Sequence, residues 1–469
     1  MIERHEFEQA QYHFAQHYLM RLRTYSELYQ VKGHIQSAVY QFENDWYQIE
    51  HSLAWAAGTD TDQGAALCLA FCEAGGFLFT DIRDFAHRLA WHTTALHAAQ
   101  RLGESRMIAY QLARLAMLHR DLNKYEDAEE YILQAATMAH ELDAHDLMVT
   151  CYHELGVITK RLGRQAEAWD FLQQSLEIAC LMDDDSQIAN SLQTLSSVAY
   201  EMGDIATALV LARESFAIFE AIGSPREIAR LAYTIGSLLL SDDTQLEDAR
   251  HFLWESYERY NMIGNKRMAA SVACNIASDL IVNVGDYAQA VQLVEDALAT
   301  YRALDYPLGI CNALTVLGDA ALKQNDLQRA REFYVEGLAL AHETQSAWDI
   351  ISLSLCLGKV ANQAEQFEEA REYLLAALAV AAENRMMGLA RLTLNQLAIP
   401  LAFQSGQIER AVELIGFAVD AACGDTLVER EAEPIIARLR QALPAPVFAQ
   451  ALERGKQLEF DNVVEELIN

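Results

Sequence analysis

Cysteine and histidine side chains near the start of the chain are the first residues whose types suggest chemistry. Cys68 and Cys72 lie four residues apart on one predicted helix face, and His87, His92 and His97 follow them. Thiolates and imidazoles are common metal ligands, so a metal site is one interpretation of this cluster. The other is core packing, because steps of five residues do not bring histidines onto one helix face. We favour core packing and expect no metal or other cofactor.

The remaining cysteines indicate the compartment rather than a reaction. They are scattered, mostly on apolar helix faces, and no CxxC pair occurs: Cys151, Cys180, Cys274, Cys311, Cys356 and Cys423. We expect all eight cysteines to be buried, reduced thiols of a cytoplasmic protein. The charged opening MIERHEFEQAQYHF has no apolar core of a signal peptide, and no apolar run approaches the ~20 residues that span a bilayer.

No catalytic motif appears in the chain. GxSxG, HExxH and GxGxxG are absent. A phosphate-binding loop needs an upstream glycine and a hydroxyl after the lysine, and both are missing from CLGKVA at Gly358–Lys359 and from ERGKQL at Gly455–Lys456. The acidic run Asp183–Asp185 precedes a predicted helix, where such residues act as N-caps. An enzyme is therefore the least favoured class.

Composition favours long helices and excludes polyanionic partners. Only 6 of 469 residues are proline, and none precedes Pro225; an interior proline would break a helix. The 67 acidic and 35 basic residues give a formal charge of −32. Because binding to nucleic acid or anionic lipid requires clustered cations, we expect the chain to bind neither nucleic acid nor a membrane.

A repeat of about 40 residues organises the elements. An aliphatic residue marks the first predicted helix of each unit: Leu115, Leu155, Leu195, Ile235, Ile276, Leu317, Leu357 and Leu397. A small residue follows each one: Ala116, Gly156, Ser196, Gly236, Ala277, Gly318, Gly358 and Ala398. An alanine marks the second helix: Ala128, Ala168, Ala208, Ala249, Ala290, Ala330, Ala370 and Ala411. Turn residues that tolerate a left-handed backbone lie between them: Asn123, Gly163, Gly203, Gly285, Asn325 and Gly406.

This pattern predicts an all-α solenoid. Small residues let two antiparallel helices approach closely, and aliphatic residues such as Leu172, Leu253 and Leu374 fill the space between hairpins. No single hairpin can bury its apolar face, so the units must stack. Three units carry one extra residue in the segments SDDTQLEDA, VNVGDYAQA and QSGQIERA. We expect the turns to absorb these insertions, because loops do so at little cost.

The units LGVITKRLGRQAEAWDFLQQSL, LGDAALKQNDLQRAREFYVEGL and LGKVANQAEQFEEAREYLLAAL resemble the tetratricopeptide repeat. The period departs from the usual 34 residues, and the usual large aromatic late in the first helix is replaced. Eight units over 105–422 fit well, and 63–104 is a degenerate ninth. The resemblance implies a right-handed superhelix of eight to nine hairpins at 63–422, between helical caps at 1–62 and 423–469. The second cap is predicted to form helices at 427–441, 445–455 and 459–468.

The two ends carry a second resemblance. QIEHSLAWAAG, AVELIGFAVDAAC and FAQALERGKQLEFDNVVEELI are similar to segments that open and close the repeat sensor region of bacterial STAND regulators, the signal-transducing ATPases with numerous domains. The matching residues are Ile49, Leu53, Trp55, Ala56, Leu414, Ile415, Gly416, Gly455, Leu458 and Leu467. Tyr47, Gln48 and Val463 depart from the usual pattern. The resemblance implies a sensor that lies C-terminal to an ATPase module of the same polypeptide.

The tetratricopeptide resemblance also implies a ligand groove. In that family the first helix of each unit lines the inner face, and the groove positions here hold six basic and three acidic residues, in contrast to the acidic chain. The candidate groove residues are Tyr110, Arg120, His153, Lys160, Arg161, Asn190, Gln193, Tyr200, Arg230, Tyr233, Asn312, Lys323, Lys359 and Asn362. Amides and phenols can bond a peptide backbone, and cations suit carboxylates. A solvated polar surface is the alternative interpretation.

The function expected from these patterns is non-enzymatic recognition. The leading hypothesis is the sensor region of a STAND-type regulator that binds a peptide or protein of acidic or polar character, with the stretch Lys160–Tyr233 favoured for contact. The alternative is a free-standing peptide receptor or adaptor, comparable to the long-repeat peptide receptors of bacterial quorum sensing.

Overall fold

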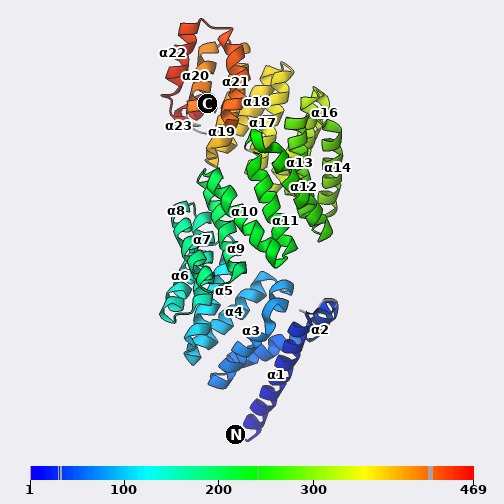
Figure 1. The fold of residues 1–469 in the computed structure, drawn as a ribbon, viewed down its shortest axis with the longest axis vertical. Helices are drawn as coiled ribbons and strands as arrows, with labels where there is room; N and C mark the ends of the chain where they lie inside the picture. Colours follow the sequence, from blue (N-terminus) through cyan, green and yellow to red (C-terminus); the bar gives the residue numbers. More distant parts are fainter. Residues whose placement is uncertain (1, 30, 32–33, 241, 421–425, 469) are drawn as a thin grey trace. The chain divides into compact units, whose positions relative to one another are not determined.

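The protein folds as an all-α helical-repeat solenoid, as the repeat predicts (Figure 1). The computed structural model describes residues 2–29, 31, 34–240, 242–420 and 426–468, and every regular element in these ranges is helical. By internal contacts the chain divides into two compact units, Met1–Leu231 and Ala232–Asn469. This division lies inside the predicted solenoid. The predicted cap boundary at 422/423 lies outside the described residues, and Cys423 does too.

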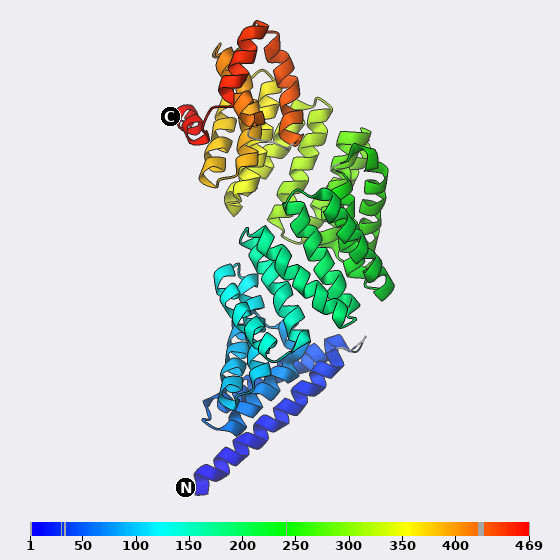
Figure 2. The same cartoon turned by 60° about the vertical axis from the view of Figure 1, so that its left-hand side comes forward.

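The first unit is built of helical hairpins whose members lie antiparallel (Figures 1 and 2). Its helices are α1 (Ile2–Tyr29), α2 (Ile35–Gly58), α3 (Asp62–Ile82), α4 (Phe85–Leu102), α5 (Ser105–Asp121), α6 (Tyr125–Glu141), α7 (His145–Arg161), α8 (Gln165–Leu181), α9 (Asp185–Glu201) and α10 (Ile205–Ile222). Helix α11 (Pro225–Leu239) contains the boundary between the units.

The second unit continues the alternation of first and second helices. Its elements are η1 (Asp243–Gln245), α12 (Leu246–Met262), α13 (Lys266–Asp279), η2 (Leu280–Val284), α14 (Tyr287–Ala303), α15 (Pro307–Lys323), α16 (Leu327–Thr344), α17 (Ala347–Gln363), α18 (Phe367–Glu383), α19 (Met387–Phe403), α20 (Ile408–Asp420), α21 (Thr426–Arg440), α22 (Ala445–Gly455) and α23 (Phe460–Ile468). The three helices predicted after residue 423 are confirmed within one residue at each end.

The predicted close approach of paired helices is confirmed. All eight repeat alanines are 0% exposed, and the repeat aliphatics are at most 2% exposed. A Cβ built on Gly156 would lie 2.4 Å from Cγ of Leu172, and one on Gly318 would lie 2.2 Å from Cε1 of Tyr334. Gly236 and Gly358 face Leu253 and Leu374 in the same way. Glycine therefore occurs where the opposing side chain is Leu or Tyr.

The other four 40-residue repeats follow the complementary rule. Where the small residue is alanine or serine, the residue at the equivalent place on the second helix is β-branched or alanine. These pairs are Ala116 with Ile132, Ser196 with Ala212, Ala277 with Val294, and Ala398 with Ile415. Ser196 also donates a hydrogen bond from Oγ to the carbonyl oxygen of Ala208, at 2.7 Å. The combined volume at the crossing is thus kept within narrow limits, as dense packing requires.

The predicted turn residues adopt the expected backbone. All six have positive φ, for example 58° at Asn123 and 79° at Gly163. Connections between successive repeats also contain a residue with positive φ; Asp183, for example, has φ 52°. Asp184 then caps α9, because its side chain accepts a hydrogen bond from the amide of Gln187.

One of the insertions is absorbed differently from the prediction. The extra residue in SDDTQLEDA falls in the connection that contains the 3₁₀ turn η1. In VNVGDYAQA it is taken up within the helix: η2 is a π-helical turn, and the amide of Gly285 donates to the carbonyl of Leu280 at 2.7 Å. A widened turn keeps the preceding backbone hydrogen-bonded while it adds one residue. The expectation that every insertion lies in a loop was wrong for the repeat that contains VNVGDYAQA.

Both ends are helical and packed onto the neighbouring hairpins. In the first unit α1 packs against α2 and α3, and Trp46, Phe79 and Trp91 form an aromatic cluster with ring centroids 4.2–6.0 Å apart. In the second unit α22 packs against α20. A Cβ on Gly416 would lie 2.4 Å from the carbonyl oxygen of Leu452, so this glycine permits the close crossing of the two helices.

The prediction for the cysteines needs one correction. Seven are described, and all are free; Cys68, Cys151, Cys274 and Cys311 are buried, Cys72 and Cys356 are partly buried, and Cys180 is exposed. Cys180 lies in the last turn of α8 beside Leu181, which is 77% exposed, so it belongs to the solvent side of the helix. No helix in the described part of the chain is long and apolar enough to cross a membrane.

Candidate functional site

A cavity of about 760 Å³ lies on the first-helix side of the second unit. Its lining residues come from four first helices, the π turn and α21: Ser278, Ile281, Val282, Asp319, Leu322, Lys323, Cys356, Lys359, Asn362, Gln363, Gln396, Ile399, Arg430, Glu431, Pro434, Ile435 and Arg438. Because α13, α15, α17, α19 and α21 all reach it, the row of first helices bends around this space. The volume is in the range of ligand sites.

The repeat places the cavity residues. Lys323 lies at the end of α15, and Lys359 and Asn362 lie one turn apart near the end of α17. The face of each first helix that carries the small residue packs against the second helix of the same hairpin. The polar face of the first helix therefore points toward the cavity. The π turn η2 contributes Ile281 and Val282, and Val282 is 55% exposed. The one-residue insertion therefore lies in the cavity wall.

Cations outnumber carboxylates in the cavity wall. Lys323, Lys359, Arg430 and Arg438 line it, together with Asp319 and Glu431. The ammonium of Lys359 lies 2.7 Å from Oε2 of Glu431. Burial disfavours the charged ammonium, but Glu431 and other acidic neighbours outweigh it and raise the pKa of Lys359. Lys359 is therefore a cation held in place by carboxylates.

Two further side chains of the cavity wall, Asp319 and Cys356, are partly buried. Burial raises the pKa of Asp319, although a hydrogen bond from Tyr334 partly counteracts it. The hydroxyl of Tyr334 lies 2.6 Å from Oδ1 of Asp319. Burial raises the pKa of Cys356 to about 12, so this thiol is neutral and not a nucleophile at ordinary pH. Asp319, Tyr334 and Cys356 therefore pack together and contribute to the electrostatics of the cavity, and we assign them no catalytic role.

Asn362 adds an unsatisfied acceptor to the cavity wall. It is 5% exposed, and its Nδ2 donates to the carbonyl oxygen of Gln396 at 3.0 Å. Its Oδ1 has no hydrogen-bond partner. Buried polar atoms are nearly always paired. Because this oxygen is itself shielded from solvent, a ligand N–H completes its bonding only when the side chain of Asn362 turns toward the cavity.

The predicted groove residues of the first unit are used between neighbouring repeats. Arg120 pairs with Glu154 of the next first helix, and Nε2 of His153 lies 3.1 Å from Oγ1 of Thr194. Nζ of Lys160 donates to Oγ of Ser197 at 2.8 Å and lies 3.6 Å from Glu201.

Glu154 is a buried carboxylate in this row. Burial opposes its ionisation, but His153 and Arg120 outweigh that effect and hold the pKa of Glu154 below its usual value. Arg230 bonds Gln193 of the preceding first helix and also Glu227 of its own helix. These contacts crosslink adjacent first helices, so most of the cations on this face are engaged within the protein.

The remaining candidates are placed as follows. Tyr110, Arg161, Tyr200 and Asn312 are exposed, and Asn190 and Gln193 are partly buried. In the second unit, the hydroxyl of Tyr233 accepts a hydrogen bond from Nδ2 of Asn275 at 2.6 Å. The structure thus brings together Lys323, Lys359 and Asn362 in one cavity, whereas the others are distributed along the first helices.

Sequence reasoning missed the contributions of α21. Arg430, Glu431 and Arg438 line the cavity, although the segment that contains them is predicted to be a cap. The guanidinium of Arg438 lies 4.0 Å from the ring centroid of Phe403, which orients it. The spacing of the buried residues Val428, Ala432, Ile435 and Leu439 indicates an amphipathic helix, but not where its polar face lies.

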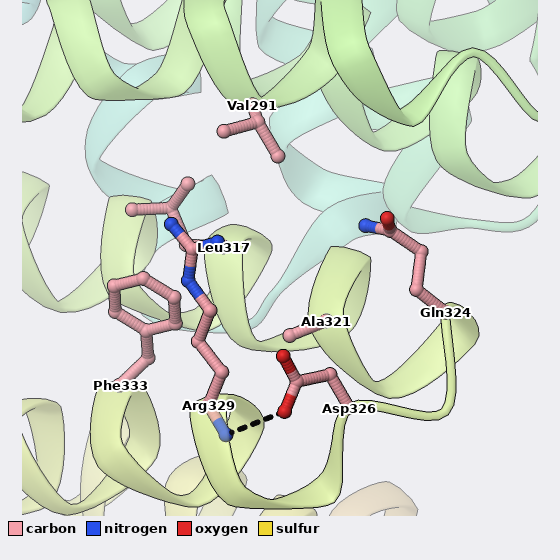
Figure 3. A pocket seen from close by; sticks show the side chains of 7 residues that line it. All are labelled: Val291, Leu317, Ala321, Gln324, Asp326, Arg329 and Phe333. Atoms are coloured by element: carbon pink, nitrogen blue, oxygen red, sulfur yellow. Dashed lines mark hydrogen bonds between the residues drawn. The ribbon is translucent and has the colours of Figure 1, made fainter.

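A second, smaller cavity in the same unit illustrates ordinary packing. It has a volume of about 50 Å³ and lies among α14, α15 and α16 (Figure 3). Val291, Leu317 and Ala321 form part of its wall, and Asp326 accepts a hydrogen bond from the amide of Arg329 as the cap of α16. A space of this size holds only one or a few waters, so it is not a ligand site.

The cysteine and histidine cluster is not assembled as a site. In the part of the chain that is described, no group of three or more His, Cys, Asp or Glu side chains is placed to hold a metal ion. His92 is buried, and its Nδ1 lies 2.8 Å from Oε1 of Gln111. His87 lies beside Asp84 instead. Cys68 and His92 are buried, as core packing predicts, whereas Cys72 and His87 are partly buried and His97 is exposed.

Comparisons with known proteins agree with this fold. The family model for the tetratricopeptide repeat matches residues 106–180, and no curated protein matches the sequence. The STAND protein with a tetratricopeptide repeat sensor from Pyrococcus horikoshii is similar in structure, with a TM-score of 0.54 and 13% identity over 82% of this chain and 55% of that one. Aspartyl phosphate phosphatase F from Bacillus subtilis has a TM-score of 0.50 and 12% identity over 79% of this chain and 93% of that one.

A third similar structure is the Rap conjugation gene regulator of plasmid pLS20 in complex with the Phr* peptide. It has a TM-score of 0.45 and 14% identity over 70% of this chain and 95% of that one. Residues 106–180 are thus a tetratricopeptide-repeat segment, and at these identities the likeness to the solved structures is one of fold.

Proposed function

We propose that the protein is a non-enzymatic recognition module that binds a peptide or protein segment of acidic or polar character on the first-helix face of its repeats. The observation that carries this proposal is the cavity of about 760 Å³ in the second unit, with its surplus of cations and its unsatisfied Asn362. An extended peptide offers both the carboxylates that cations bind and the N–H groups that a free amide oxygen accepts.

A larger role follows from the two resemblances. We propose that the module is the sensor region of a STAND-type regulator in the cytoplasm, in which ligand binding releases an ATPase module of the same polypeptide. The likeness of sequence segments at both ends supports this role, and so does the likeness of fold to a STAND protein whose sensor is a tetratricopeptide repeat. A free-standing peptide receptor remains the alternative.

Peptide selection tests the binding function. A phage library of random dodecapeptides is panned against the protein, and the enriched peptides are measured by fluorescence anisotropy. Because Lys323 is exposed at the cavity, Lys323→Gln should weaken binding about tenfold without a change in the melting temperature. Arg371→Gln is the matched control, since Arg371 is an exposed residue of the second helix α18. Failure to enrich any peptide, or equal binding by the two variants, would refute the cavity as the site.

The size of the native product tests the sensor role. An antibody raised against this chain is used on a lysate of the source cells. A band far above 52.6 kDa supports a sensor within a larger regulator. A band at 52.6 kDa instead supports the free-standing receptor, and the peptide selection applies unchanged to that case.

A further inference from the structure

The cavity of the second unit already contains a carboxylate bound to its central lysine. Glu431 reaches Lys359 from α21, with Oε2 2.7 Å from Nζ. The pair joins α17 to α21, which are more than 60 residues apart in the chain, so it is a tertiary contact and not a contact within one helix. Both side chains remain partly accessible, at 25% for Lys359 and 30% for Glu431.

The surroundings of this pair suit a carboxylate that comes from outside. Lys323, Arg430 and Arg438 line the same cavity, so a second carboxylate would find cations close at hand. Arg438 is oriented by its stacking on Phe403. Asp319 also lines this cavity, and its Oδ1 already accepts a hydrogen bond from the hydroxyl of Tyr334.

The wall also offers a place for the chain that carries the carboxylate. Asn362 follows Lys359 by three residues on α17, and its buried Oδ1 has no hydrogen-bond partner. A peptide whose carboxylate meets Lys359 has backbone N–H groups nearby, and one of them can bond to Oδ1 once the side chain of Asn362 turns this shielded oxygen toward the cavity. A buried acceptor without a partner disfavours the empty site, so this bond adds to the preference for a peptide over a free acid.

We propose that Glu431 is an internal stand-in for the ligand, and that the cavity takes a peptide carboxylate that displaces Glu431 from Lys359. This inference rests on the proposed function and deepens it. The carboxylate is either an Asp or Glu side chain or the C-terminus of the ligand. An internal competitor lowers the apparent affinity by the fraction of time for which it occupies the site. If the ion pair is formed in nine of ten molecules, its removal should tighten binding about tenfold.

The test uses four acetylated hexapeptide libraries with a fluorescein label. Three are amidated at the C-terminus and fix the third residue as Glu, Gln or Lys, and the fourth has neutral residues and a free C-terminal carboxylate. Binding to wild type, Glu431→Gln and Lys359→Gln is measured by anisotropy. Glu433→Gln is the matched control, because it removes the same charge from an exposed residue of the same helix.

The expected result is tighter binding by Glu431→Gln of the Glu library or of the free-carboxylate library, by about three- to tenfold, with Glu433→Gln equal to wild type. The library that gains identifies the source of the carboxylate. Lys359→Gln should lose the binding of that library. Glu431→Asp has a shorter side chain that reaches Lys359 less well, so it should give an intermediate gain and serves if Glu431→Gln folds poorly.

Two outcomes overturn the inference and can be told apart. If the Glu or free-carboxylate library binds with the same affinity to Glu431→Gln and Glu433→Gln, Glu431 is not a competitor and the proposed function stands. If no library binds to any variant, and peptides from phage selection are absent as well, both the inference and the proposed function fail.

Discussion

Replacing Gly156 by alanine should destabilise the protein, although the same change in a helix usually stabilises it. The added Cβ would lie 2.4 Å from Cγ and 2.8 Å from Cδ2 of Leu172, whereas carbon atoms prefer about 3.5–4.0 Å. Leu172 is 0% exposed and cannot swing into solvent. Overpacking of this kind costs about 3 kcal/mol at the upper end, and the helix propensity of alanine returns about 1 kcal/mol. The net loss should be about 2 kcal/mol.

The natural pairs supply a compensating change. In the preceding repeat the corresponding pair is Ala116 and Ile132. Gly156→Ala combined with Leu172→Ile therefore recreates a pair that the chain already uses. Leu172→Ile alone should cost about 1 kcal/mol. If the two changes relieve each other, the double variant should lose about 1 kcal/mol instead of the additive loss of about 3 kcal/mol.

Hydrogen exchange is the suitable assay, because a long repeat array need not unfold in one step. Exchange of amides in α7 and α8 reports the local free energy of opening for the Gly156 variants, and exchange in α19 and α20 reports it for the control. Gly388→Ala is the control: Gly388 lies in α19, where an added Cβ would have no neighbouring atom within 4 Å, and this variant should gain up to about 1 kcal/mol. A Gly156→Ala variant that gains as much as this control, or a strictly additive double variant, would refute the packing argument.

Two further predictions concern buried groups. Burial lowers the pKa of His92 from 6.5 to about 4. Between these two pH values the imidazole is protonated in the unfolded chain but neutral in the folded protein. Stability should therefore fall by about 3 kcal/mol between pH 6.5 and pH 4, and His92→Gln should flatten that part of the profile of melting temperature against pH; parallel profiles would contradict this. Ala330→Glu places an unpaired charge at a helix crossing that is 0% exposed and should cost more than about 3 kcal/mol by thermal melting, whereas Ala339→Glu on the exposed side of the same helix should stay within about 0.5 kcal/mol. Equal melting of these two alanine variants would argue against the repeat register.

The repeat could be predicted from the sequence because its determinants are local. The aliphatic, the small residue and the alanine lie within one hairpin, and Asn123 and Gly163 mark turns whose backbone few other residues adopt. The same pattern contains the pairing of glycine with Leu or Tyr. That rule can be read from the eight units alone, since Gly156 and Leu172 recur in phase as Gly358 and Leu374.

The site could be predicted only in part. Lys323, Lys359 and Asn362 follow from their phase on the first helices. Glu431 does not, because α21 lies beyond the point where the 40-residue period ends, and its position depends on packing against α19 and α20. Glu154 was missed for a different reason: it lies one residue from a groove position, and only the structure shows that it bonds Arg120.

These contacts bear on the choice between the two stretches of first helices. In the first unit, Arg120, Lys160 and Arg230 are bonded to neighbouring repeats, so a ligand there would have to break contacts that hold the stack together. In the second unit the cations line a cavity, and the ligand needs to replace only the side chain of Glu431. The smaller cost of that exchange favours the second unit over the stretch from Lys160 to Tyr233 that the sequence favours. On this proposal, the crosslinked face of the first unit holds neighbouring repeats together, and the ligand binds in the second unit.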